Sequence, residues 1–95
     1  MVDRLSDDAI ESSLANHSEW ARNGDSIQRT FGFGDFMGSI GFVDRLAIRA
    51  EDVQHHPDIL IRYNKVTITL STHDAGGISE RDFTFAGDCD RLYVG

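Results

Sequence analysis

The chain has 95 residues, one cysteine and a formal net charge of −7 at pH 7. Its length predicts one small domain over residues 1–95, and its acidic charge argues against nonspecific binding to nucleic acid. The lone cysteine excludes an intrachain disulfide framework and fits a reducing compartment. No apolar run approaches the length of a membrane span, and the N-terminus lacks a signal-peptide pattern, so we expect a cytoplasmic protein.

The first part of the chain predicts a helix followed by a β-hairpin. Ser6 can cap the helix, whose first turn is acidic, and the helical pattern fades near Asn16. Alternating apolar and polar residues over 27–33 indicate a strand. The turn residues Gly24-Asp25 separate it from a shorter strand over 18–23.

A long helix should follow, capped by Asp35 and running from about Phe36 to His55, because apolar residues recur there at helical spacing. A helix of about 20 residues is a rod about 30 Å long, which should cross one face of the sheet. A glycine inside a helix costs roughly 1 kcal/mol relative to alanine. Gly38 and Gly41 therefore indicate close packing, either on the chain's own sheet or against another subunit.

The strand register of the second predicted hairpin indicates which histidines lie opposite each other. With Asn64-Lys65 as a two-residue turn, Tyr63 pairs with Val66. Continued to the open end of the hairpin, this register places His56 opposite His73. One face of the hairpin is apolar and should pack beneath the helices: Ile59, Ile61, Tyr63, Val66, Ile68 and Leu70.

A last helix should begin after Ser79, with Asp82 three residues later in a variant of the capping box. The predicted order is helix, two strands, helix, two strands, helix. The fold class is therefore α+β, a four-stranded antiparallel sheet with three helices on one face.

Three of the four histidines, His55, His56 and His73, lie around this second hairpin, and Pro57 directly follows the first two. The fourth, His17, stands alone at an element boundary and should be exposed. Histidine can donate or accept a proton near neutral pH. No serine or cysteine nucleophile has a convincing partner nearby, so the residues favour proton-transfer chemistry, meaning elimination, hydration or isomerisation, over acyl transfer.

Two alternatives stay open on the residues alone. Three histidines with Asp82 could hold zinc or iron, although adjacent residues rarely point to one centre and the helical spacing of four between two histidines is absent. The histidines could also simply satisfy hydrogen bonds where elements join.

A family resemblance adds to this interpretation. The residues that carry it are Phe31-Gly32-Phe33, Asp35-Phe36, Ala50-Glu51, His55-His56-Pro57-Asp58, Tyr63-Asn64-Lys65-Val66, Leu70-Ser71-Thr72-His73-Asp74 and Gly77-Ile78-Ser79-Glu80-Arg81-Asp82. In type and spacing they resemble the pterin-4a-carbinolamine dehydratase family, over residues 25–82. The resemblance implies a lyase without cofactor or metal, which removes water from a 4a-hydroxytetrahydropterin to give the quinonoid dihydropterin.

The resemblance also implies site residues and an assembly. His55, His56 and His73 would be catalytic, and a set formed by Glu51, Pro57 and Asp82 would bind substrate. We expect His56 and His73 to share the proton transfers while His55 positions the pterin. Members form homodimers or homotetramers, and self-association would help a chain this small to bury apolar surface.

Two positions depart from the family pattern and bear on the pterin-stacking wall. The family usually has an aromatic residue where this chain has Ile59, and Trp20 is displaced by about two places.

Two other functions remain open. One is a binding or dimerisation module, as in animals, where a member partners a homeodomain transcription factor. The other is a pterin role near molybdenum-cofactor metabolism.

Overall fold

The computed structural model describes residues 2–94. Its elements are α1 (Asp7–Ala15), β1 (Ala21–Asn23), β2 (Ser26–Gly32), α2 (Phe36–Val53), β3 (Asp58–Arg62), β4 (Lys65–Leu70), a 3-10 helix η1 (His73–Ala75) and α3 (Glu80–Leu92). The predicted α+β class and element order are confirmed.

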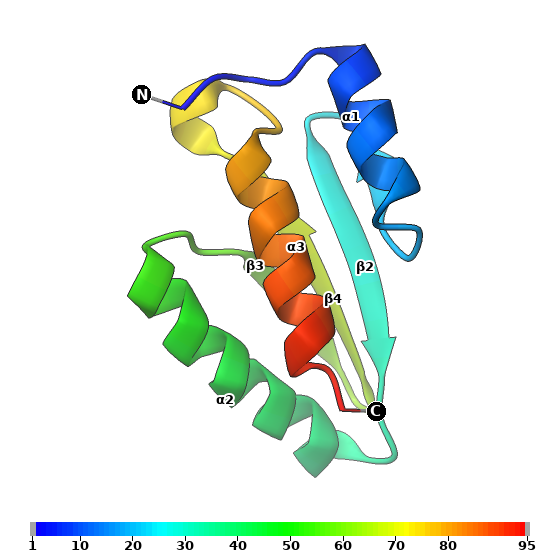
Figure 1. The fold of residues 1–95 in the computed structure, drawn as a ribbon. Coiled ribbons are helices and arrows are strands. Elements are labelled where there is room, and N and C mark those ends of the chain that lie inside the picture. The colour runs from blue at the N-terminus through cyan, green and yellow to red at the C-terminus, as the bar shows by residue number, and fades with distance from the viewer. Residues whose placement is uncertain (1, 95) are drawn as a thin grey trace.

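The four strands form one antiparallel sheet in the order β1-β2-β4-β3. All three helices lie on the same side of this sheet, with α3 between α1 and α2 (Figure 1). The predicted caps are confirmed, because Ser6, Asp35 and Ser79 each accept a backbone N–H of the helix that follows. Among residues 2–94, no helix is both long enough and apolar enough to cross a bilayer.

The core lies between the helices and the inner strands. Val66, Ile68 and Leu70 alternate along β4 and are fully buried, as the apolar pattern predicted. The edge strand β3 is different, because Ile59 is 37% exposed and Tyr63, beyond its end, is 66% exposed. The prediction that the whole apolar face of the hairpin packs under the helices is therefore wrong for these two residues.

The hairpin register also differs from the predicted one. Arg62 pairs with Lys65 and Asp58 with Thr69, so the turn residues are Tyr63-Asn64 and the predicted pairing of Tyr63 with Val66 is wrong. Continued past the strands, the observed register places His56 opposite Ser71. The predicted opposition of His56 and His73 is therefore not formed by strand pairing.

Contacts from outside the hairpin explain this shift of the turn. The hydroxyl of Ser39, in α2, donates to the carbonyl of Tyr63 at 2.8 Å. The side-chain amide of Asn64 donates to the carbonyl of Phe33 at 3.0 Å, and the Phe33 N–H donates back to the Asn64 carbonyl at 2.8 Å. These bonds hold Tyr63 at a φ of 50°, a conformation that a non-glycine residue seldom adopts in isolation.

Helix α2 ends at Val53, two residues before the predicted end. Gln54 forms its left-handed C-cap with φ 53° and ψ 46°, which releases His55 and His56 from the helix. Within the same helix, a Cβ added at Gly38 would lie 3.1 Å from the Cβ of Phe33. Gly38 therefore packs closely against the segment that follows β2, which favours packing within the chain over packing against another subunit at that position.

Candidate active site

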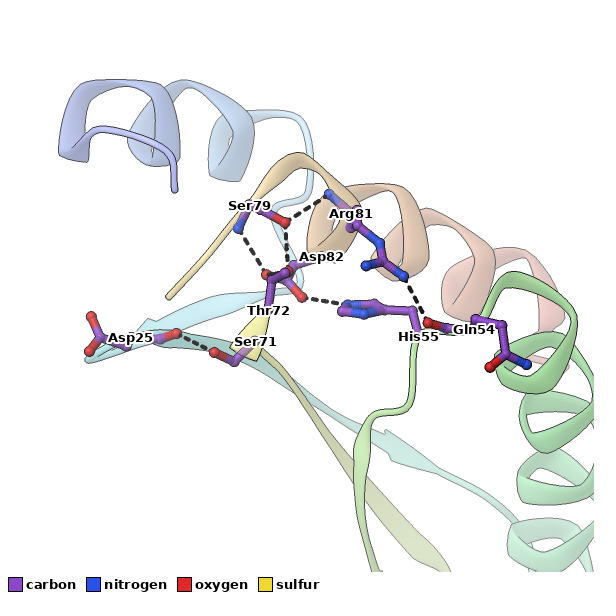
Figure 2. Close-up of polar contacts among 8 residues, drawn as sticks. All are labelled: Asp25, Gln54, His55, Ser71, Thr72, Ser79, Arg81 and Asp82. Carbon is purple, nitrogen blue, oxygen red and sulfur yellow. Dashed lines mark hydrogen bonds and ion pairs between the residues drawn. The ribbon is translucent and has the colours of Figure 1, made fainter. Parts of the chain in front are cut away.

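His55 is the histidine that the fold buries. It follows the left-handed cap of α2, and its ring is oriented toward α3 (Figure 2). The residue is 8% exposed, and its Nε2 lies 2.7 Å from Oδ1 of Asp82. The edge of the ring also meets Phe85, with ring centroids 6.0 Å apart. The structure thus brings into contact two residues that the sequence analysis had placed in one candidate site.

Asp82 is fully buried in the first turn of α3. Its second oxygen, Oδ2, accepts hydrogen bonds from the Thr72 hydroxyl and the Ser79 backbone N–H, each at 2.9 Å. The hydroxyls of Thr72 and Ser79 are themselves 2.6 Å apart (Figure 2). A buried carboxylate costs free energy unless hydrogen bonds compensate it, and here three donors surround one carboxylate.

The ends of α2 and α3 are joined beside this group. Arg81 donates from Nη2 to the carbonyl of Gln54 at 2.8 Å (Figure 2). A cavity of about 260 Å³ lies between the two helices, lined by Val53, His55, Glu80, Arg81, Thr84, Phe85 and Asp88. His55 is the only residue of the predicted site in this lining.

His56 and Glu51 form a second histidine–carboxylate pair. Glu51 is in the last full turn of α2, and its Oε2 lies 2.5 Å from His56 Nε2. Both side chains are exposed, to 56% and 73%. Pro57, which follows, is half-buried and leads into β3. This pair is open to solvent, in contrast to the buried pair of His55 and Asp82.

His73 opens the 3-10 helix η1 and is exposed. Its neighbour Thr72 is 2% exposed and forms an isolated β-bridge with Gly77, which closes the short loop between them. His73 is thereby held one residue beyond the buried network around Asp82. Thr72 and Ser79 were missed as members of the site. One signal could have found them, because Thr72 directly precedes His73 and Ser79 caps the helix that carries Asp82.

Trp20 and His17 make contacts elsewhere in the fold and are not part of the candidate site. The Trp20 indole, 4% exposed, donates to Asp90 at 2.9 Å and packs against Phe31. His17 is half-buried rather than exposed, so that expectation is wrong, and its Nδ1 donates to the Ser13 carbonyl at 2.9 Å.

Cys89 is fully buried, and burial, followed by the charges of Asp90 and Asp88, raises the pKa of its thiol. A nucleophilic thiolate is therefore disfavoured at this position. Within residues 2–94, no group of three His, Cys, Asp or Glu side chains is placed to hold a metal ion.

The described geometry defines a class of site: two histidine–carboxylate pairs at the junction of a helical layer and an antiparallel sheet, suited to moving protons. The family model described as Pterin 4 alpha carbinolamine dehydratase matches residues 3–92, and the chain belongs to this family.

Similar proteins cover nearly the whole chain. A protein of Picosynechococcus sp. is 48% identical over 97% of this chain and 100% of its own length. One of Thermosynechococcus vestitus is 50% identical over 99% of both chains. Both are named provisionally as pterin-4-alpha-carbinolamine dehydratases.

Two solved structures are also similar. One, from Brucella melitensis, is described as a transcriptional coactivator/pterin dehydratase, with a TM-score of 0.91 and 32% identity over 95% of this chain and 98% of that one. The other is described as a pterin dehydratase-like protein and RuBisCO assembly factor of the alpha-carboxysome. It has a TM-score of 0.68 and 30% identity over 80% of this chain and 90% of that one.

Proposed function

We propose that the chain dehydrates a 4a-hydroxytetrahydropterin to the quinonoid dihydropterin by histidine acid–base catalysis, without a cofactor. The observation that carries the proposal is the buried contact between His55 and Asp82 beside a cavity, in a member of the pterin-4a-carbinolamine dehydratase family. The same proposal places the reaction in tetrahydropterin recycling in the cytoplasm.

The reaction needs one proton donor and one proton acceptor. The C4a–O bond breaks and the hydroxyl leaves as water once it has received a proton. A neighbouring ring nitrogen loses its proton as the double bond to C4a forms. The proton given by the acid is balanced by the proton taken by the base, and each transfer is worth roughly 10²–10⁴-fold in rate.

Three histidines supply these groups in our proposal. His55 has a ring orientation fixed by Asp82, so it accepts the proton from the pterin ring nitrogen. His56 and His73 are exposed and can exchange protons with solvent, so they supply the proton to the leaving hydroxyl. This differs from the expectation that His55 only positions the pterin, and the buried carboxylate behind His55 is the reason.

The remaining predicted residues have supporting roles. Glu51 orients the ring of His56 through the 2.5 Å contact. Pro57 is half-buried at the start of β3, and we propose that it borders the pterin. Asp82 is fully buried, so it acts through His55 and does not touch the substrate.

A stopped-flow assay of 4a-hydroxytetrahydropterin dehydration tests the function. We expect turnover well above the uncatalysed rate, with a loss of roughly 10²–10⁴-fold in H55A and H73A. The control is H17A, because His17 lies between α1 and β1, outside the candidate site, and its ring donates to the Ser13 carbonyl of α1. A wild-type rate equal to the uncatalysed one would contradict the proposal, and near-native turnover in both H56A and H73A would remove those two residues from it.

A binding or dimerisation module is the second candidate. Relatives described as a coactivator and as an assembly factor favour it, as do Met37 and Ile48, exposed to 71% and 74% on α2. Absence of dehydration in a folded protein would favour this candidate. In either case we propose a homodimer or homotetramer, which sedimentation equilibrium would distinguish from a monomer.

A further inference from the structure

The hydrogen bonds around Asp82 have a direction that follows from counting donors. Thr72 has one hydroxyl hydrogen, which it donates to Asp82 Oδ2 at 2.9 Å. The 2.6 Å contact between Thr72 Oγ1 and Ser79 Oγ must then carry the hydrogen of Ser79. Ser79 Oγ in turn accepts the backbone N–H of Arg81 at 3.2 Å. The buried hydroxyls therefore form a chain that ends on the carboxylate.

The two oxygens of Asp82 are not equivalent. Oδ2 receives both the Thr72 hydroxyl and the Ser79 N–H, which leaves Oδ1 for His55 at 2.7 Å. A carboxylate oxygen only accepts hydrogen bonds, so Nε2 of His55 carries a hydrogen. In the neutral imidazole this leaves Nδ1 as the proton acceptor.

Nδ1, the other ring nitrogen of His55, is not enclosed by the protein. It has no hydrogen-bond partner among the described residues, where Nε2 alone is bonded. Over residues 2–94, no buried side-chain nitrogen or oxygen lacks a partner. Nδ1 is therefore not sealed from solvent, although His55 as a whole is 8% exposed and lines the cavity between α2 and α3.

We propose that Thr72 and Ser79 are positioning residues, which hold Asp82 so that His55 keeps its hydrogen on Nε2 and presents Nδ1 as the working nitrogen. The catalytic consequence rests on the proposed dehydratase function, whereas the tautomer does not. Thr72 is buried while its neighbour His73 is exposed, because the Thr72 hydroxyl is part of the hydrogen-bond network around Asp82.

The variant D82N provides the sharpest test, because the asymmetry of Asp82 dictates how an amide must sit. The amide oxygen must occupy the Oδ2 position, where two donors converge. The amide nitrogen then points at His55 and donates to Nε2, so the hydrogen of the neutral ring moves to Nδ1. We expect the ¹⁵N chemical shifts of His55 at high pH to report Nε2–H in the wild type and Nδ1–H in D82N. Turnover should fall by roughly 10⁴-fold, as a wrong histidine tautomer does in serine proteases.

Thr72 variants test the positioning role directly. T72V keeps the shape of the side chain and removes the hydroxyl, so kcat should fall about tenfold with KM within about twofold. Its His55 ¹⁵N shifts should move toward an average of two tautomers. T72S keeps the hydroxyl and should recover most of the lost kcat. The control is T67V, on β4, where the hydroxyl bonds only to Thr30 on the open face of the sheet.

The proposal is overturned if wild-type His55 carries its neutral-state hydrogen on Nδ1, or if D82N leaves it on Nε2. It is also overturned if T72V has the kcat and the His55 shifts of the wild type. If T72V does not fold, the turnover of T72S and the His55 tautomer in D82N still test the proposal. An inactive wild type with the expected tautomers would reject the proposed dehydratase function and leave the tautomer assignment intact.

Discussion

Asp82 bonds His55 through one carboxylate oxygen at 2.7 Å and caps α3 through the other. One side chain therefore fixes both the start of a helix and the orientation of a candidate catalytic ring. Because helix capping and site geometry depend on the same group, a change at Asp82 should alter stability and activity together. This coupling distinguishes the buried pair from the exposed pair of Glu51 and His56.

D82A should strongly destabilise the protein. It leaves His55, the Thr72 hydroxyl and the Ser79 N–H without their buried acceptor, and removing one partner of such a network costs roughly 3–5 kcal/mol. Urea unfolding monitored by circular dichroism would measure the loss. The control D74A removes an exposed carboxylate from η1 and should change the free energy of unfolding by less than about 0.5 kcal/mol. Equal stability of D82A and D74A would contradict the network described here.

E51Q should have the opposite profile. Both side chains of the Glu51–His56 pair are exposed, so its loss should cost under about 1 kcal/mol of stability. The orientation of His56 would be lost, and we expect kcat/KM to fall about tenfold, a change of about 1.4 kcal/mol in transition-state stabilisation. D52N, on the same turn and paired with Arg49 at 3.0 Å, is the matched control and should retain wild-type turnover. If the two variants had the same kcat/KM, Glu51 would have no role in the site.

The sequence predicted the parts of this site that depend on local chemistry. Capping preferences located Ser79 and Asp82 at the start of α3, and helical spacing placed the end of α2 near the histidine pair. The prediction from the sequence failed where contacts from distant residues determine the local structure. The turn lies at Tyr63-Asn64 because Ser39 and Phe33 form hydrogen bonds with it. Such contacts leave no signal in the hairpin's own alternation, and a small register change alters every extrapolated pairing.

The edge position of β3 could not be predicted from its composition either. Ile59 and Leu60 look like residues of a buried strand, yet they are 37% and 58% exposed. The exposure of Ile59, which pairs with the buried Ile68, follows from the strand order, in which β3 pairs only with β4. Leu60 pairs with Thr67 and therefore faces the open side of the sheet. Strand order is a property of the whole chain, because it depends on which distant strands pair with one another.

Q54G should stabilise the protein by about 0.5–1 kcal/mol. Gln54 has a φ of 53°. The left-handed conformation costs a residue with a Cβ roughly 1–2 kcal/mol of stability, which glycine avoids. Part of this gain is offset, because glycine loses more conformational entropy on folding than other residues. A47G, at an exposed position inside α2, should instead destabilise by about 1 kcal/mol. Thermal or urea unfolding of both variants measures the difference. A destabilised Q54G would show that the 2.7 Å bond from the Gln54 side chain to the Glu51 carbonyl outweighs the backbone term.

Cys89 should make the stability depend on alkaline pH. Burial raises the pKa of its thiol in the folded state above the ordinary value of 9.0. Below pH 9 the thiol is protonated in both states and contributes no pH dependence. Above pH 9 the unfolded chain releases a proton that the folded chain retains, so the free energy of unfolding falls with rising pH. The slope approaches about 1.4 kcal/mol per pH unit well above pH 9.

The measurement compares the free energy of unfolding of the wild type and C89A from pH 8 to 10.5, since the other titrating groups are common to both. The difference between them should change with pH in the direction that favours C89A, and parallel curves would show that the thiol ionises as readily in the folded protein as in the unfolded chain.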